Sequence, residues 1–302
     1  MFGNMVGFDT LEFNVRISRE KAIAKSETPP TYCNANKNVF LVQFFNYQAR
    51  FEYGFLHFFG SIQKAINGQN VNCNIGEQWQ YLIKLFDYLQ ISPGYTHVTR
   101  YDIATTIETE TPTNVVLKNF GELSGRRKRV IGDKIFSIYY DKYKVRETIK
   151  RGKVEDLKNT LLFYNKAYQA KVNGEILRLE YRNMKPPQLC TIPILCRNFE
   201  TYCKQIADEL NKLTINPINE IVMKANTMAE LKDALTIYAI RAAEQNNPNF
   251  IAETLEKLKL TSGATPREFW RFKSTIADKL QEQTAPTDYA IIERLKSALL
   301  SV

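Results

Sequence analysis

Three short segments carry residue types that can act on a phosphate group, and the first is HVTRYDIATTIE at residues 97–108. Its β-branched residues and its alternation predict a strand. On a strand Arg100, Asp102 and Glu108 share one face, because side chains alternate with a period of two. Two acids and an arginine are costly to bury unless they are paired or bound to a metal. The segment therefore predicts either a divalent-metal site or the solvated outer face of an antiparallel sheet.

The second segment is LRLEYR at residues 177–182. As a strand it places Arg178, Glu180 and Arg182 on one side and its apolar residues on the other. A carboxylate between two arginines stays ionised and is suited to hold a metal beside phosphates. The same pattern is also that of a surface ion-pair ladder, so both interpretations stay open.

The third feature is a pair of tyrosine-bearing runs, IFSIYYDK at residues 135–142 and TLLFYNK at residues 160–166. A tyrosine can attack phosphorus when neighbouring groups take its proton and stabilise charge on the phosphate. A lysine two residues away or on a neighbouring strand would supply that help. The alternative is that these tyrosines pack as amphipathic residues at strand ends.

In this order, VTRYDIA (98–104), IFSIYYDK, LLFYNKAYQAK (161–171) and ILRLEYR (176–182) resemble the replication initiators of rolling-circle plasmids and filamentous phages. Those proteins show a T-R-hydrophobic-D-hydrophobic-A strand, a tyrosine-bearing strand, a Y-D/N-K strand and an R-hydrophobic-E-hydrophobic-R strand. The resemblance covers residues 8–185. It implies a nicking-closing endonuclease whose tyrosine attacks an origin phosphodiester, stays linked to the 5′ phosphate and frees a 3′ hydroxyl.

The resemblance also implies a cofactor, Mg²⁺ or Mn²⁺, held by Asp102 and Glu180. The family often has a second acid four residues after the first, where this chain has Thr106. Glu108, on the same face, is expected to stand in for it. A further departure is Gln169, at a position where the family usually has a glutamate.

By position in the resemblance, Lys166 is the lysine that contacts or neutralises phosphate. The nucleophile is expected to be Tyr140 or Tyr139, because their strand precedes the YNK strand, and Tyr164 is the third candidate. If the YDK at residues 140–142 were instead the family's Y-D-K, no tyrosine would stand at the nucleophile position before it.

The charge excess of the chain lies in one block, Gly121 to Lys185, with 17 Lys and Arg against 8 Asp and Glu, which equals the +9 of the whole protein. Tyrosines are interleaved with these cations, as in a groove for single-stranded nucleic acid. With the resemblance, this predicts single-stranded or supercoiled origin DNA as the partner. The GRRKR run at residues 125–129 suits either DNA contact or a solvated hairpin tip. The cations expected to hold DNA are Arg100, Arg126, Arg127, Lys128, Arg129, Lys142, Arg178 and Arg182.

The elements that must position these residues are strands in the first two thirds of the chain. Strands are expected at 8–17, 38–53, 52–59, 97–108, 134–140, 160–164 and 175–182, with a helix after Asn74 that stops near Ser92-Pro93-Gly94. The fold class predicted is α+β, an antiparallel sheet with helices on one face as in replication-initiator nucleases. No internal repeat is visible.

Beyond the prolines at 186, 187 and 193 the predicted secondary structure is helix alone. Helices are expected near 198–213, 217–226, 228–246, 248–259, 266–282 and 287–300. This predicts a nicking and DNA-binding domain at 1–195 and a helical domain at 196–302. The helical tail would read origin sequence, bind a host helicase or polymerase, or form a homodimer.

Composition narrows the class of protein further. The N-terminus lacks the apolar run of a signal peptide and no stretch is long enough for a membrane span, so no membrane partner is expected. Five cysteines without zinc spacing suggest reduced thiols in a cytoplasm, and two histidines exclude a His-rich metal centre. Of these, His57 is expected at a core or boundary position. The alternatives to an enzyme are a non-catalytic origin-binding initiator or regulator, or a phage structural protein.

Overall fold

The computed structural model describes residues 5–34, 38–69, 73–132, 136–148, 152–215 and 287–301. The chain divides into two compact units, one holding Met1–Leu117, Glu122–Leu213 and Glu293–Val302, the other Lys118–Gly121 and Thr214–Ile292. The helices expected between residues 217 and 282 lie outside the described residues. The domain boundary expected at residue 195 stays a prediction.

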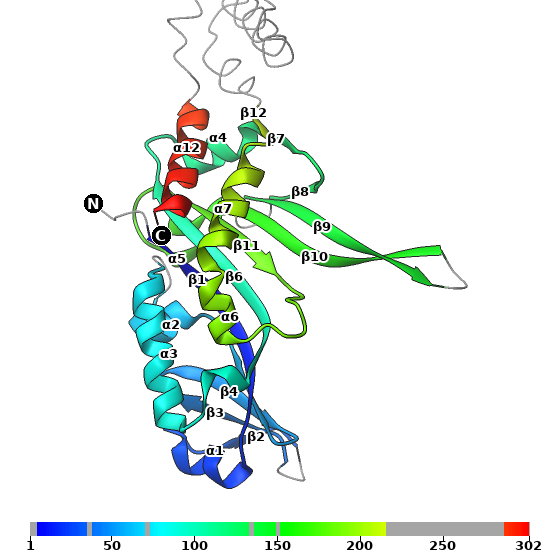
Figure 1. Cartoon of the computed structure of the whole chain (residues 1–302). Helices are drawn as coiled ribbons and strands as arrows, with labels where there is room; N and C mark the ends of the chain where they lie inside the picture. Colours follow the sequence, from blue (N-terminus) through cyan, green and yellow to red (C-terminus); the bar gives the residue numbers. More distant parts are fainter. Residues whose placement is uncertain are drawn as a thin grey trace, which may run out of the picture. The chain divides into compact units, whose positions relative to one another are not determined.

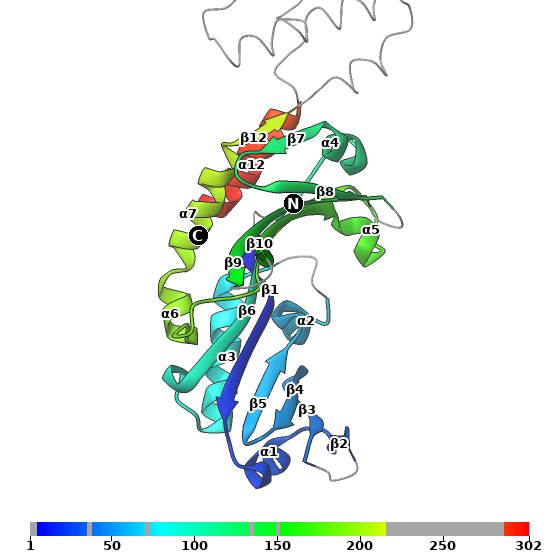
Figure 2. The same ribbon diagram turned by 90° about the vertical axis from the view of Figure 1, so that its right-hand side faces the viewer.

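Ten strands form one sheet in the order β2-β3-β4-β5-β1-β6-β11-β10-β9-β8 (Figures 1 and 2). Every neighbouring pair in it is antiparallel, which confirms the predicted α+β class with an antiparallel sheet. Two further strands, β7 (Phe120–Leu123) and β12 (Leu213–Ile215), pair separately. The strands of the large sheet are β1 (Met5–Arg16), β2 (Thr31–Tyr32), β3 (Phe40–Phe44), β4 (Tyr47–Glu52), β5 (Phe55–Phe59), β6 (Thr96–Glu108), β8 (Arg127–Ile131), β9 (Ser137–Thr148), β10 (Gly152–Asn165) and β11 (Ile176–Asn183).

The predicted arrangement of helices on one face is seen for α3, α6 and α7, which all lie on the same side of the sheet (Figure 2). The expected cap at Asn74 is confirmed, since its side chain accepts from the backbone N–H of Gly76 at 3.0 Å. The helices are α1 (Arg19–Lys25), α2 (Ile62–Asn67), α3 (Ile75–Leu89), α4 (Thr113–Asn119), α5 (Lys166–Ala170), α6 (Ile192–Arg197), α7 (Phe199–Leu210) and α12 (Thr287–Leu300), with a 3₁₀ turn at Pro93–Tyr95.

The core lies between the sheet and these helices, and β1 runs through its centre. Phe8 is fully buried, and its ring centroid lies 5.5 Å from that of Trp79 on α3 and 5.0 Å from that of Phe199 on α7. The register between β1 and β6 shifts from Phe8 to Thr10, so one extra residue bulges out at Asp9. This bulge explains why the apolar residues of β1 keep only a rough period of two.

The order of elements in the first half of the sheet recurs in the second half. A long strand and a seven-residue helix (β1 and α1, β6 and α4) precede strands that run from the outer edge of the sheet inward. A six-residue helix and a longer one follow (α2 and α3, α6 and α7). The second half adds β7 and α5. Since β1 and β6 pair antiparallel at the centre, the halves are related as by a two-fold axis through the sheet, a repeat that the sequence does not show.

The basic stretch between the two tyrosine runs contributes to two long paired strands. β9 and β10 pair from Ser137 with Tyr164 out to Thr148 with Gly152, and together they extend away from the rest of the sheet (Figure 1). The GRRKR run likewise contributes β8 after a turn at Gly125, whose φ of 78° suits glycine. The strands β8 and β9 of the basic block therefore lie at one edge of the sheet.

Candidate functional site

The charged residues of β6 and β11 lie on the face of the sheet opposite α3, α6 and α7. Arg182 pairs with Asp102, and Glu180 with Ala104, in the antiparallel register of β11 and β6. Their neighbour Tyr101 points the other way and stacks on Tyr202 of α7, with ring centroids 5.6 Å apart. We call the face without these helices the open face. The two motifs recognised in the sequence therefore meet on it, as the alternation of side chains predicted.

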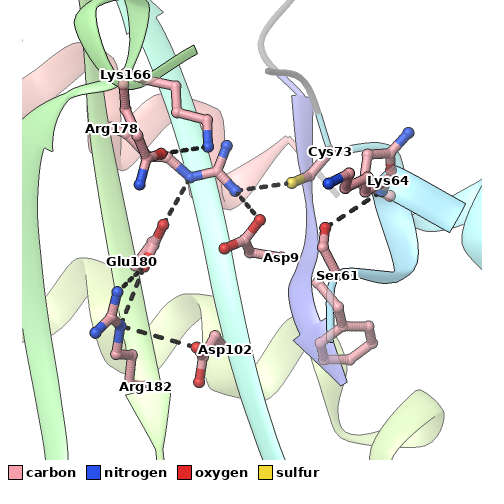
Figure 3. Close-up of polar contacts among 12 residues, drawn as sticks. Asp9, Ser61, Lys64, Cys73, Asp102, Lys166, Arg178, Glu180 and Arg182 are labelled. Atoms are coloured by element: carbon pink, nitrogen blue, oxygen red, sulfur yellow. Dashed lines mark hydrogen bonds and ion pairs between the residues drawn. The ribbon is translucent and has the colours of Figure 1, made fainter. Parts of the chain in front are cut away.

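On the open face, acids and arginines alternate in one connected row (Figure 3). Arg100 binds Asp102 at 2.6 Å, and Arg182 lies 3.8 Å from Asp102 and 2.8 Å from Glu180. Arg178 then binds Glu180 at 3.0 Å and Asp9 at 2.8 Å. This set, which we call the arginine ladder, comprises Glu12, Arg100, Asp102, Arg182, Glu180, Arg178 and Asp9.

The ladder is largely withdrawn from water, and this shapes its electrostatics. Burial raises the pKa of the Asp102 carboxyl to about 6, against the opposing effect of the bound Arg100 guanidinium. Burial also acts to raise the pKa of Glu180, but Arg178 and Arg182 outweigh it and hold that carboxyl at a pKa of about 2. Glu180 is therefore firmly ionised, whereas Asp102 titrates closer to neutrality.

The carboxylates of the ladder do not have the arrangement of a metal centre. Both oxygens of Asp102 accept from Arg100, and both oxygens of Glu180 accept hydrogen bonds, from Tyr164 and Arg178 on one side and Arg182 on the other. No group of three or more His, Cys, Asp or Glu residues able to hold an ion occurs within the described ranges. Glu108 is exposed and pairs with Ile176, beyond the ladder. The residues present thus fit an ion-pair ladder and not a Mg²⁺ or Mn²⁺ site, and no chemical step is assigned to a metal here.

The tyrosines expected as nucleophiles fall on different faces of the sheet. Tyr139 pairs with Leu162, which pairs with Glu180, so Tyr139 is on the open face, where it is half-buried. Tyr140 points into the core, fully buried, with its ring 5.9 Å from that of Phe163. Burial raises its pKa above the ordinary tyrosine value. The structure brings Tyr139, and not Tyr140, to the face that carries the ladder.

Tyr164 is also on the open face, but its hydroxyl is engaged. It donates a short hydrogen bond to Glu180, and its residue is only 4% exposed. Burial and the neighbouring Glu180 charge raise its pKa well above the ordinary value. Both effects oppose the loss of its proton, so Tyr164 is suited to hold Glu180 in place.

Lys166 opens α5 next to this tyrosine, and Asn165 caps the helix. Its ammonium is buried, donates to Gln169 at 2.7 Å and lies 5.8 Å from the Tyr164 ring centre. Burial, assisted by the nearby Arg178 charge, lowers the pKa of Lys166 to about 8. Gln169, which stands where the family usually has a glutamate, therefore accepts a hydrogen bond from this lysine.

The cations expected to hold DNA divide into buried and exposed ones. Arg126 has a side chain that is 2% exposed, binds Glu209 of α7 at 2.5 Å and donates to two backbone carbonyl groups, so it holds structure together. Arg127 and Lys142 are exposed, Arg129 is half-exposed, and Lys128 is partly buried. Arg178 is fully buried, whereas Arg100 and Arg182 are partly exposed.

Sequence reasoning missed three participants. Asp9 reaches Arg178 because of the bulge in β1, and no local pattern announces such a bulge. Cys73 accepts from Arg178 at 3.3 Å. Asp141, directly after the tyrosine pair, is buried and accepts from Arg129 at 3.1 Å and Thr160 at 2.8 Å. The acid that directly follows the tyrosine pair in the YYDK run was the signal that could have pointed to Asp141.

Comparisons with known proteins give a structural likeness but no match by sequence. No protein-family model matches the chain, and no curated protein matches it. A solved structure named as a rolling circle replication initiator protein from Geobacillus stearothermophilus is similar to it, at 13% identity and a TM-score of 0.42. The similarity covers 70% of this chain and 86% of that one. None of the described helices is long and apolar enough to cross a membrane, and all five cysteines are free thiols.

Proposed function

We propose that this protein is a rolling-circle DNA replication initiator that nicks origin DNA with Tyr139 as the nucleophile. One observation carries the choice of residue. Among the three candidate tyrosines, Tyr139 combines partial exposure with a place on the open face. The guanidinium of Arg129 lies 4.4 Å from its ring centre, a cation–π distance.

The chemistry follows from that placement. The phenolic oxygen of Tyr139 loses its proton and forms a bond to phosphorus, while the bond from phosphorus to the 3′ oxygen breaks. The phenolic proton passes to water, the 3′ oxygen takes up a proton from water and leaves as a hydroxyl, and the 5′ phosphate stays on the tyrosine. Negative charge on the other phosphate oxygens is stabilised by fixed cations, for which Arg129 and the partly exposed Arg182 are placed on the same face.

The substrate proposed is single-stranded or supercoiled origin DNA. Exposed Arg127 and Lys142 are on β8 and β9, at the same edge of the sheet as Tyr139. Such contacts to phosphate position a strand without reading its sequence. A nick needs access to one strand only, and this suits a half-buried tyrosine on a flat sheet face.

The test uses the full-length protein and a random-sequence pool of single-stranded oligonucleotides. After incubation, SDS-resistant protein–DNA adducts are recovered, the linked peptide is identified by mass spectrometry, and the attached strands are sequenced. We expect an adduct at Tyr139 with an enriched sequence next to the linked phosphate. Tyr139→Phe should abolish the adduct, and Tyr140→Phe, on the buried face, serves as the matched control. Adducts of undiminished yield from Tyr139→Phe would refute the assignment.

A second candidate is a non-catalytic origin-binding initiator or regulator. It is favoured by the saturation of the ladder carboxylates, which leaves no cluster of three metal ligands in the part of the chain that the structure describes. In that case the protein binds the pool with unchanged affinity after Asp102→Ala or Tyr139→Phe, and no adduct forms with any variant. The same capture experiment separates the two functions.

A further inference from the structure

The repeated order of elements allows each position on one half of the open face to be matched to a position on the other. Counting three residues from the central pair of Leu11 and Tyr101 reaches Asn14 on β1 and Ala104 on β6. Asn14 pairs with His57, and Ala104 pairs with Glu180. His57 of the first half therefore corresponds to Glu180 of the ladder.

The correspondence continues outward across the sheet. Arg50 pairs with His57, and Leu162 with Glu180; Leu41 then pairs with Arg50, and Tyr139 with Leu162. Leu41 thus occupies the place of the proposed nucleophile. Two residues away along each strand, Glu52 corresponds to Tyr164 and Phe59 to Arg182. At these positions the first half therefore lacks the residue types of Tyr139, Tyr164, Glu180 and Arg182.

A pocket of about 690 Å³ nevertheless opens at this matched location, and it is lined by Cys33, Leu41, Arg50, Glu52, His57 and Phe59. Its volume is in the range of roughly 300–1,000 Å³ typical of small-ligand sites. Five of the six lining residues belong to β3, β4 and β5, the strands that correspond to β9, β10 and β11. The pocket and the proposed nicking site are therefore two versions of one location in the repeat.

The lining favours a flat, uncharged, aromatic ligand with a polar edge. Arg50 and Glu52 bind each other at 2.6 Å, so they bring no net charge and offer a donor beside an acceptor. The His57 ring contacts Asn14 through Nδ1 at 2.6 Å, and burial lowers its pKa, which favours the neutral imidazole. Phe59 supplies an aromatic ring and Leu41 an apolar side chain. Side chains of these kinds bind a nucleobase by stacking and by hydrogen bonds at its edge.

Exposed aromatic residues continue beyond the pocket. Phe55, beside it on β5, is 41% exposed, and Tyr53 at the turn between β4 and β5 is 87% exposed. Aromatic side chains on a sheet face are the means by which single strands are held without reading their sequence. The open face is thus neutral and aromatic on the first half and cationic on the second. This arrangement suits bases bound on the first half and phosphates bound on the second.

We infer that this pocket binds an unpaired nucleobase of the single-stranded DNA whose backbone is held on the second half. The inference rests on the proposed function, because it assumes DNA on the open face. β5 and β11 are separated by β1 and β6, which at a spacing of about 4.8 Å per strand places them roughly 14 Å apart. One strand of DNA reaches both in a few nucleotides.

The experiment measures binding of a fluorescein-labelled oligothymidylate to the full-length protein by anisotropy, with thymidine monophosphate as a competitor. We expect Phe59→Ala to weaken binding by about 5- to 100-fold, as loss of one stacked base does. Leu41→Glu, an exposed position on the pocket wall, should weaken it similarly by placing an anion beside the base. The matched control is Leu189→Glu at an exposed leucine outside the sheet. Circular dichroism confirms that each variant is folded.

Photocrosslinking with 5-iododeoxyuridine in the same strand locates the base, and we expect the crosslinked peptide to contain Phe59, Phe55 or Tyr53. Unchanged affinity of both pocket variants, or crosslinks confined to β8–β11, would overturn the pocket and leave the proposed function standing. Absence of any binding by the wild-type protein would refute both the nucleobase pocket and the proposed function. Competition by free thymidine monophosphate at equal concentration would show a nucleotide site and not a strand site, and so would also overturn the inference.

Discussion

Arg182 lies between two carboxylates, 2.8 Å from Glu180 and 3.8 Å from Asp102, so that one guanidinium is shared by both acids. A guanidinium and a metal ion compete for the same oxygens. The protein is therefore arranged to keep these acids neutralised by arginine. Any use of Mg²⁺ or Mn²⁺ requires this arginine to release them, for instance to a phosphate.

This competition predicts how the protein takes up metal. Arg182→Ala frees the Glu180 oxygen that Arg182 binds and removes a positive charge from beside Asp102, so we expect it to bind Mn²⁺ at least about tenfold more tightly than the wild-type protein, an effect of about 1.4 kcal/mol. Electron paramagnetic resonance of free Mn²⁺ measures the affinity. Arg50→Ala, which frees only Glu52, is the control and should leave the affinity unchanged. Equal affinities for all three proteins would show that the ladder does not form a latent metal site.

The central arginine of the ladder should be important for stability. Arg178 is fully buried and binds Asp9 and Glu180, so Arg178→Met leaves two carboxylates short of a partner. We expect the free energy of unfolding to fall by about 3 kcal/mol, measured by urea denaturation. Arg50→Met removes an exposed ion pair and should cost less than about 1 kcal/mol. A loss as small as that for Arg178→Met would mean that its buried pairs contribute little.

Lys166 should make stability depend on pH. Its pKa is lowered from 10.5 to about 8, so the folded state gives up the proton that the unfolded state keeps between these values. The free energy of unfolding therefore rises with pH across this window by about 3 kcal/mol and carries the full penalty below pH 8.

Replacing this lysine tests that sign. Lys166→Met removes the buried charge and the hydrogen bond to Gln169, and should stabilise the protein at pH 7 by about 2 kcal/mol and flatten the rise above pH 8. Urea denaturation at pH 7 and pH 10 measures both effects. Lys204→Met, at an exposed position of α7, should keep the wild-type profile. A destabilised Lys166→Met with an unchanged profile would contradict the prediction.

The two neighbouring arginines of the GRRKR run should differ in their effect on DNA binding. Arg127 is exposed, so Arg127→Gln should lower the slope of log affinity against log salt by about one and leave stability unchanged. Arg126 is bound to Glu209, so Arg126→Gln should leave the slope unchanged and reduce the free energy of unfolding by about 2 kcal/mol. Anisotropy titrations of a labelled single strand at several salt concentrations measure the slopes. The reverse pattern would place Arg126, and not Arg127, at the phosphates.

The strands that carry the candidate site residues, and the face on which those side chains lie, could be predicted from the sequence. Alternation placed Asp102 with Arg100, and Glu180 with Arg178 and Arg182, on one face, because a strand's period of two does not depend on its neighbours. The N-cap of α3 at Asn74 was likewise predicted from residues close to it in the sequence. In these cases the signal lies within a few residues of the feature that it predicts.

What could not be predicted depends on pairing between distant strands. Whether Glu180 binds a metal or arginines is decided by the register that sets Arg182 opposite Asp102, and both outcomes have the same local pattern. The choice between Tyr139 and Tyr140 likewise depends on which face of β9 is covered by helices. Asp9 joins the ladder only because β1 bulges at that point.

The central pairing of β1 with β6 bears on how a chain built of two related halves can arise. Either half alone would present the whole backbone edge of its long strand to solvent, and an uncovered edge of that length pairs with other molecules. A single half would therefore tend to pair edge to edge with a second copy as a symmetric dimer. When both halves belong to one polypeptide, β1 and β6 cover each other's edges. The side chains on the two halves are then free to differ.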